Sequence, residues 1–303
     1  MKIQMIGAAL GAGAQDQRCA QGPSALHESR LIETLKTKGL EVGDFPILNS
    51  FGQASYLEAL PLIAAFNKGL AAKVGTHFLR GEFPVVIGGD HSIAAGTWSG
   101  IANSLGGDLG LLWIDAHMDS HTVESSETGA VHGMPLAALL GHGEVGLSQI
   151  GTAKAKLKPE NVCLLGVRSF EEGEARLLKE LGVRVYGIDE IESRGFQICL
   201  REAHAQITRA TAGFGITLDL DALDPVHFPS VGSPVDFGLR YDAVKRGLES
   251  LAFDPRFCAL EIVEYNPSLD ESGLSATMVI EILASTLRAR QDAELLACTA
   301  TGT

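Results

Sequence analysis

The chain has 303 residues, of which 46% are hydrophobic and 20% are charged. This composition is typical of globular proteins and excludes collagen-like, coiled-coil and disordered chains. The 24 Lys and Arg residues stand against 37 Asp and Glu residues, giving a net charge of -13. That balance argues against nucleic acid or an anionic membrane as a partner, and it is compatible with a cationic substrate or metal ions.

Short β-rich runs alternate with helical stretches along the whole chain, which is the pattern of a parallel sheet with crossover helices. We expect strands at residues 3–8, 41–48, 84–87, 109–114, 161–167, 184–188, 215–218 and 258–263. Helices are expected at residues 54–79, 173–181, 241–251 and 275–290. The Ala/Thr-rich residues 291–303 are expected to fray or to serve as a small contact arm. The sequence therefore predicts an α/β fold, with one domain over residues 1–303.

Six side chains that can bind a metal follow three of the expected strands: His91; Asp115, His117 and Asp119; Asp219 and Asp221. The carboxyl ends of strands are where open α/β sheets bind ligands. Residues at alternate positions of an extended segment point to the same side, so each cluster converges. Four carboxylates this close would repel one another without cations.

This ligand set predicts two divalent ions, about 3.5–4 Å apart, which would activate a water molecule. Oxygen and imidazole ligands without a thiolate favour Mn²⁺, with Co²⁺, Ni²⁺, Fe²⁺ and Zn²⁺ as alternatives. The Gly-Gly-Asp-His cluster alone is equally compatible with a capped turn.

Three signatures resemble the ureohydrolase family, which includes arginases and agmatinases. Residues 88–92 read Gly-Gly-Asp-His-Ser, residues 115–119 read Asp-Ala-His-Met-Asp, and residues 217–225 match the family's Ser-x-Asp-x-Asp-x-x-Asp-Pro with Thr217 in place of Ser. The resemblance is strongest to arginases. It implies a three-layer α/β/α fold with a central eight-stranded parallel sheet, a binuclear manganese centre, and hydrolysis of a small guanidino substrate to urea and an amine.

The resemblance also implies which metal each ligand binds. His91 and Asp119 are implied to bind one metal, and His117 and Asp221 the other. Asp115 and Asp219 are implied to bridge both metals. His132 matches the family's proton-shuttling histidine, and an imidazole can move protons near neutral pH. Glu264 matches the acidic residue that receives the guanidinium. The alternative for Glu264 is an exposed position at the end of a strand.

Five further residues are implied to contact the substrate: His121, Thr128, Glu171, Glu174 and Ser233. Arginases usually carry Asn at the position of His121, Asp at the position of Glu171 and Thr at the position of Ser233. They also carry Ser-Gly-Asn where this chain has Thr-Gly-Ala, which begins at Thr128. These differences change the side chains available to bind the α-carboxylate and α-ammonium groups of the substrate. L-arginine is the expected substrate, and agmatine, guanidinobutyrate or another guanidine are the alternatives.

A catalytically weak homologue that uses its metals for binding is a further alternative. A metallophosphoesterase is disfavoured because the chain lacks a Gly-Asn-His-Asp/Glu element, and a dinucleotide site is disfavoured because no GxGxxG follows the first strand. Five scattered cysteines without a Cys-x-x-Cys pair predict a reduced, cytoplasmic protein. We expect no signal peptide and no membrane span, and the family resemblance implies a trimer or hexamer.

Overall fold

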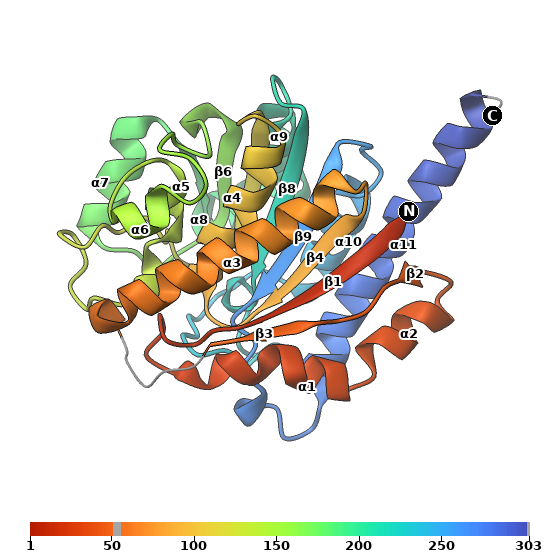
Figure 1. Ribbon diagram of the computed structural model, residues 1–303, viewed down its shortest axis with the longest axis horizontal. Helices are drawn as coiled ribbons and strands as arrows, with labels where there is room; N and C mark the ends of the chain where they lie inside the picture. Colours follow the sequence, from red (N-terminus) through yellow and green to blue (C-terminus); the bar gives the residue numbers. More distant parts are fainter. Residues whose placement is uncertain (51–55, 302–303) are drawn as a thin grey trace.

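A computed structural model of the protein describes residues 1–50 and 56–301, with side chains through residue 296. A twisted parallel sheet forms the middle layer, and helices cover both of its faces (Figure 1). The strands are β1 (Lys2–Ala9), β2 (Glu41–Val42), β3 (Ile47–Asn49), β4 (Phe83–Gly88), β5 (Leu109–Ile114), β6 (Val162–Val167), β7 (Arg184–Gly187), β8 (Gly213–Asp219) and β9 (Phe257–Val263).

The strand order is β2-β1-β4-β9-β8-β5-β6-β7, and β3 also pairs with β1. Every strand pair is parallel. The expected strand at residues 41–48 is split into β2 and β3, which lie along the same edge of β1. Pro46, which has no N–H to donate, stands in the break and accepts a hydrogen bond from Gly7 N. The sheet thus has the eight strand positions predicted, one of them interrupted.

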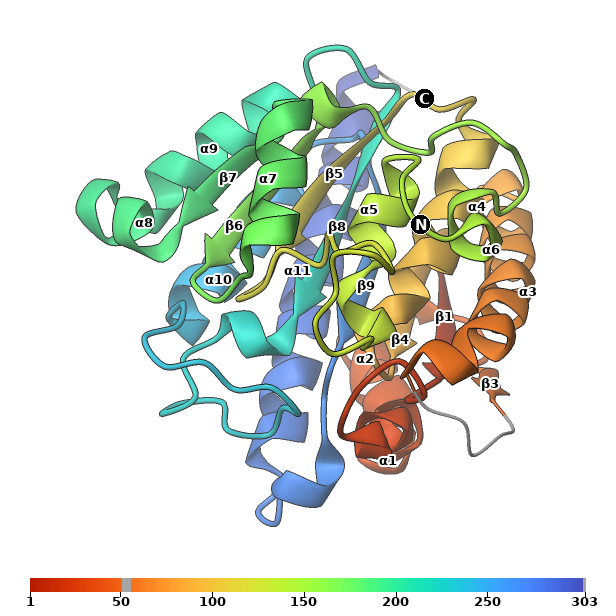
Figure 2. The ribbon, with the colours of Figure 1, turned by 90° about the vertical axis from the view of Figure 1, so that its left-hand side faces the viewer.

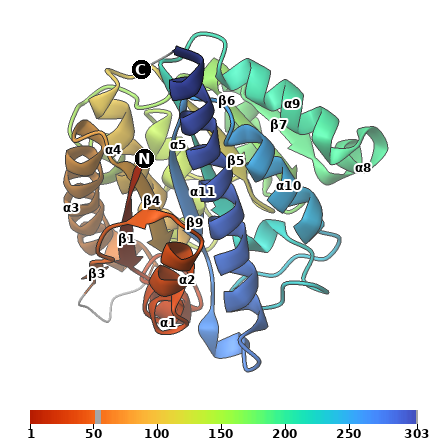
Figure 3. The same cartoon turned by 90° about the vertical axis from the view of Figure 1, so that its right-hand side faces the viewer.

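Two hydrophobic cores lie on opposite faces of the sheet. Figure 2 shows the face covered by α3 (Leu60–Leu79), α4 (Ala94–Ser104), α5 (Pro135–Leu139), α6 (Val145–Ser148) and α7 (Glu172–Leu181). Figure 3 shows the other, covered by α1 (Gly22–Glu28), α2 (Leu31–Thr37), α8 (Ile188–Arg194), α9 (Phe196–Ile207), α10 (Tyr241–Leu251) and α11 (Leu274–Thr301). The strands are buried over nearly their full length because helices pack on both sides.

Two of the expected helices, at residues 173–181 and 241–251, match α7 and α10 closely. The expected helix at residues 54–79 begins later as an α-helix: Ala54 and Ser55 lie outside the described residues, Tyr56–Ala59 is a 3₁₀ turn, and α3 starts at Leu60. Pro61 suits that first turn, since a helix needs no N–H there.

Residues 291–301, which were expected to fray, continue α11 in the structure (Figure 1). This segment contains no Gly or Pro, and its Ala and Leu residues favour helix. Within the described residues, no helix combines the length and apolar character needed to cross a membrane.

Candidate metal centre and substrate cavity

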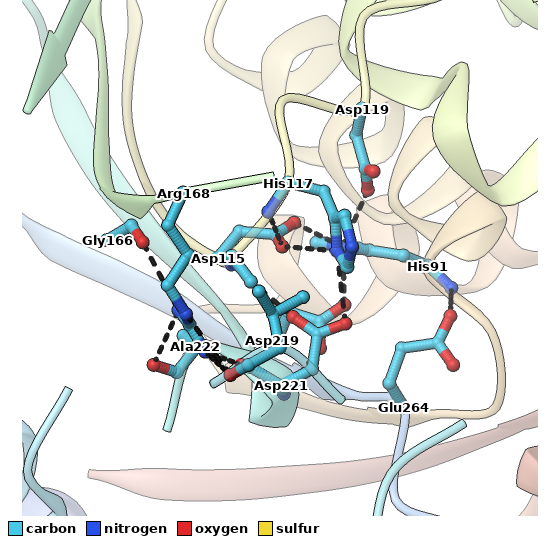
Figure 4. A network of polar contacts seen from close by, with 12 residues as sticks. His91, Asp115, His117, Asp119, Gly166, Arg168, Asp219, Asp221, Ala222 and Glu264 are labelled. Carbon is cyan, nitrogen blue, oxygen red and sulfur yellow. Dashed lines mark hydrogen bonds and ion pairs between the residues drawn. The ribbon is translucent and has the colours of Figure 1, made fainter. Parts of the chain in front are cut away.

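The predicted metal ligands follow the carboxyl ends of strands β4, β8 and β5, which lie near the middle of the sheet. His91 follows β4, Asp115 follows β5, and Asp219 ends β8. Glu264 follows β9, the strand between β4 and β8. Figure 4 shows these side chains, which come from distant parts of the sequence, pointing toward one another. The parallel topology therefore assembles the site at one edge, as the sequence predicts.

The first group of ligands surrounds the ring of His91. Its Nδ1 lies 3.1 Å from Asp115 Oδ2, 2.9 Å from Asp119 Oδ2 and 3.0 Å from Asp219 Oδ2. All four side chains are buried, and this Nδ1 has no hydrogen-bond partner. Three carboxylate oxygens around a ring nitrogen that forms no hydrogen bond fit a divalent cation, which would accept lone pairs from all four.

The second group contains His117, Asp115 and Asp221. His117 Nδ1 lies 3.2 Å from Asp221 Oδ2 and 3.5 Å from Asp115 Oδ1. Asp115 therefore directs one oxygen toward each group, as a bridging ligand requires. Asp219 directs Oδ2 toward His91, while its Oδ1 accepts a hydrogen bond from Asp221 N at 2.8 Å.

The six side chains of the two groups are called the cage below: His91, Asp115, His117, Asp119, Asp219 and Asp221. Without cations, the carboxylates of the cage repel one another. Burial raises the pKa of Asp119 to about 6, with the nearby Asp115 as the next cause. Burial also raises the pKa of Asp219, and the charges of Asp221 and Asp115 add to the shift. The pKa of Asp115 is lowered despite its burial, because the nearby rings of His117 and His91 favour the ionised carboxylate. Divalent ions would remove this repulsion and favour the ionised carboxylates.

Side chains behind the metal ligands orient them, a role that was not predicted from the sequence. His91 Nε2 lies 3.0 Å from Thr217 Oγ1, which donates to Glu261 Oε1 at 2.8 Å. Because Glu261 accepts from Thr217, the hydroxyl accepts from Nε2–H, which leaves the Nδ1 lone pair of His91 free. Trp113 Nε1 donates to Asp115 Oδ2 at 2.9 Å. The two-residue spacing of Trp113 and Asp115 along one strand face was the available sequence signal.

The half-buried His132 and the buried Glu264 form a pair beside the six metal ligands. His132 Nδ1 lies 3.0 Å from Glu264 Oε1, which also accepts from His91 N at 2.9 Å. Glu264 is 2% exposed, so the exposed alternative is excluded. Burial lowers the pKa of His132, but the hydrogen bond and charge of Glu264 outweigh it and raise the pKa to about 9. This pairing favours the protonated imidazole at neutral pH.

The five residues implied to contact substrate all line one cavity: His121, Thr128, Glu171, Glu174 and Ser233. His117, Asp119, His132, Asp219 and Asp221 line the same cavity, so it joins the metal ligands to the substrate-binding residues. Gln15, Ser169 and Phe170 also line it and were not predicted as site residues.

Two carboxylates and a histidine meet at one side of this cavity. His121 Nε2 contacts Glu171 Oε2, and Glu171 N donates to Glu174 Oε1 at 3.0 Å at the start of α7. Burial raises the pKa of Glu174 to about 7. An ammonium group bound here would favour the ionised carboxylate.

Comparisons with known proteins identify relatives that match nearly the whole chain. The chain matches the model of the Arginase family over residues 1–288. It is 40% identical over 291 residues to an arginase of Bacillus caldovelox, covering 93% of this chain and 97% of that protein. It is 38% identical over 289 residues to an arginase of Bacillus subtilis (strain 168), covering 94% and 97%. A crystal structure of arginase from Bacillus cereus superimposes with a TM-score of 0.89 at 37% identity, covering 94% of this chain and 98% of that one.

Proposed function

This chain belongs to the arginase family of metal-dependent ureohydrolases, and we propose that it hydrolyses L-arginine to L-ornithine and urea with two Mn²⁺ ions. The proposal rests on two groups of metal ligands that share Asp115. These two groups lie next to a cavity lined by Glu171 and Glu174. The relatives named above as arginases support the choice of L-arginine over other guanidines.

We propose that His91 and Asp119 bind one ion and that His117 and Asp221 bind the other. Asp115 and Asp219 would bind both ions. Bound divalent ions supply Lewis acidity and lower the pKa of a water. Mn²⁺ is proposed because the donors are carboxylates and imidazoles, with Co²⁺, Ni²⁺, Fe²⁺ and Zn²⁺ as alternatives.

His132 and Glu264 would handle the proton and the guanidinium. Glu264 Oε1 accepts from His132 Nδ1 and holds the imidazolium. This leaves His132 Nε2–H to deliver a proton to the leaving amine nitrogen. We assign to Glu264 Oε2 the guanidinium N–H groups, which a carboxylate accepts in charge-assisted hydrogen bonds. Ser233 adds a hydroxyl to the cavity that His132 also lines.

The other end of the substrate would meet the α7 side of the cavity. Glu171 and Glu174 provide carboxylates for the α-ammonium group, and Thr128 provides a hydroxyl for the α-carboxylate. His121 contacts Glu171, so it orients this carboxylate as well as facing the substrate. An ammonium between two carboxylates, one of them buried, is a favourable charge arrangement.

The test is urea release by Mn²⁺-loaded protein from L-arginine, agmatine, 4-guanidinobutyrate and guanidine, with metal content measured on the same sample. The highest kcat/KM for L-arginine supports the proposal. A higher kcat/KM for another guanidine would identify that compound, and not L-arginine, as the preferred substrate. No urea from any compound, with two metals bound, contradicts ureohydrolase activity of this chain and favours the alternative of a catalytically weak homologue.

We also propose that residues 1–303 form one domain and that the protein acts in the cytoplasm as a trimer or hexamer. The family resemblance supports the oligomer. Cys19, Cys163 and Cys199 are buried, free thiols, which supports a reducing compartment. Sedimentation equilibrium tests the oligomer, and a monomeric mass contradicts it.

A further inference from the structure

We propose that Arg168 is a positioning residue that joins the two chain segments carrying the second group of metal ligands. This inference rests on the metal centre of the proposed function, because it concerns how strongly that centre holds its ions. Arg168 follows β6, and its side chain extends toward the chain segment after β8 (Figure 4).

The guanidinium of Arg168 donates to main-chain oxygens of six residues: Gly166, Asp221, Ala222, Leu223, Val235 and Asp236. The shortest of these bonds run from Nη2 to Asp221 O and to Val235 O, both at 2.8 Å. Arg168 therefore holds the main chain at a proposed metal ligand and ties it to the loop around residue 235.

The backbone of Arg168 contacts the other ligand segment. Arg168 N donates to Ala116 O at 2.9 Å, and Ala116 lies between Asp115 and His117. Ala116 N in turn lies 3.4 Å from Asp221 Oδ1. One residue thus bonds to the chain at the end of β5 through its amide and to the chain after β8 through its side chain. These two segments supply all three ligands of the second group.

The chemistry of this junction requires arginine. A guanidinium presents five N–H donors in a rigid plane, whereas a lysine ammonium presents three on a flexible stem. The hydrogen bonds that the structure shows for this guanidinium all go to carbonyl oxygens. Asp221 Oδ2 and Asp115 Oδ1 consequently stay directed at His117, where a cation would bind them.

The first group of ligands has separate supports. His91 is oriented through Thr217, and its amide is bound by Glu264. Removing the Arg168 side chain should therefore weaken the ion at His117 and Asp221 before the ion at His91. Loss of a group that orients metal ligands typically lowers metal affinity by about 10- to 100-fold.

The experiment compares Mn²⁺ binding by the wild-type protein, Arg168→Met and Arg168→Lys, using equilibrium dialysis and electron paramagnetic resonance. The wild-type protein is expected to bind two Mn²⁺ per chain with the signal of a coupled pair. Arg168→Met is expected to bind one at the same free Mn²⁺, with a mononuclear signal, and to regain the second at about tenfold or higher free Mn²⁺. Arg168→Lys should fall between the two, and it decides the question if Arg168→Met does not fold.

Arg290→Met is the matched control. Arg290 is also a buried arginine that donates to main-chain oxygens, those of Phe257 and Pro255, but it touches no ligand segment. It should lower thermal stability and keep both ions. Wild-type affinity for both ions in both Arg168 variants, loss of both ions together, or the same selective loss in Arg290→Met overturns the inference. A wild-type protein that holds two Mn²⁺ and releases no urea refutes the proposed activity alone, since the binding comparison still decides the role of Arg168.

Discussion

His132 Nδ1 and Glu264 Oε1 lie 3.0 Å apart, and the same oxygen accepts the backbone N–H of His91 at 2.9 Å. One carboxylate oxygen therefore connects the proposed proton donor to the chain segment that carries a metal ligand. Glu264 holds this place with a φ of 67°, in the left-handed region that non-glycine residues rarely adopt. Backbone strain of this kind persists where the surrounding structure enforces it, and often at functional sites.

The His132 and Glu264 pair predicts a pH dependence. The pKa of His132 is about 9, above its usual 6.5, because the hydrogen bond and charge of Glu264 outweigh burial. The imidazolium persists below that pKa and is lost as pH rises through it, so proton donation and kcat should fall above about pH 9. In Glu264→Gln, the neutral amide no longer favours the charged ring, and the pKa of His132 should fall. Titration of the His132 ring by NMR measures this shift, and an unchanged pKa contradicts the pairing.

The shared position of Asp115 predicts that the two ions depend on it together. Its Oδ2 faces His91 and its Oδ1 faces His117, so Asp115→Ala removes a ligand from both groups. We expect both metals and urea release to be lost. Asp119 faces only His91, so Asp119→Ala should keep the ion at His117 while losing activity. Metal analysis of the two purified variants checks this, and equal metal content in both would contradict the bridging role.

The fold and the metal cage could be predicted because their signals are local. Apolar runs followed by Asp and His mark strand ends, and parallel strands bring those ends to one edge whatever the strand order. The break between β2 and β3 was not predicted, although Gly43, Asp44 and Pro46 lie inside it and disfavour a continuous strand. The end of α11 escaped because residues 291–301 have high helix propensity but no strong amphipathic pattern.

The supports of the site could not be predicted from the sequence. Arg168 donates to main-chain carbonyl oxygens, and every residue has a main-chain carbonyl. The residue types of the partner segments therefore do not indicate this contact. Glu261 lies inside a buried strand, where its partners Trp98 and Thr217 come from elements distant in sequence. His121 was recognised as unusual, but its contact with Glu171 depends on how the loop after β5 meets the start of α7.

The contact between His91 and Thr217 predicts a selective loss of metal affinity. Thr217→Val removes the hydroxyl that accepts from His91 Nε2 and keeps the shape of the side chain. The ring is then free to rotate or change tautomer, and affinity for the ion at His91 should fall by about 10- to 100-fold. Thr217→Ser retains the hydroxyl and should bind metal like the wild-type protein. Mn²⁺ titration of the three proteins measures this, and equal affinity of the Val and wild-type proteins would refute the orienting role.

The position of Glu171 predicts an effect on substrate binding that depends on the ammonium group. Glu171→Gln removes a charge from the cavity, and a hydrogen bond between charged groups contributes about 1.5–3 kcal/mol. The Glu171 side chain is 48% exposed, so solvent screening keeps the loss near the lower limit, and KM for L-arginine should rise about tenfold. 4-Guanidinobutyrate has no ammonium group and should not lose affinity. Steady-state urea assays with both compounds test this.

Glu172→Gln is the matched control for that prediction, because Glu172 is the adjacent exposed carboxylate and does not line the cavity. Its KM for L-arginine should equal that of the wild-type protein. If both variants raise KM equally, the effect reflects the general negative charge at the start of α7 rather than contact with the substrate. If Glu171→Gln leaves KM unchanged, the ammonium group binds elsewhere in the cavity, and buried Glu174 becomes the carboxylate to test by the same assay.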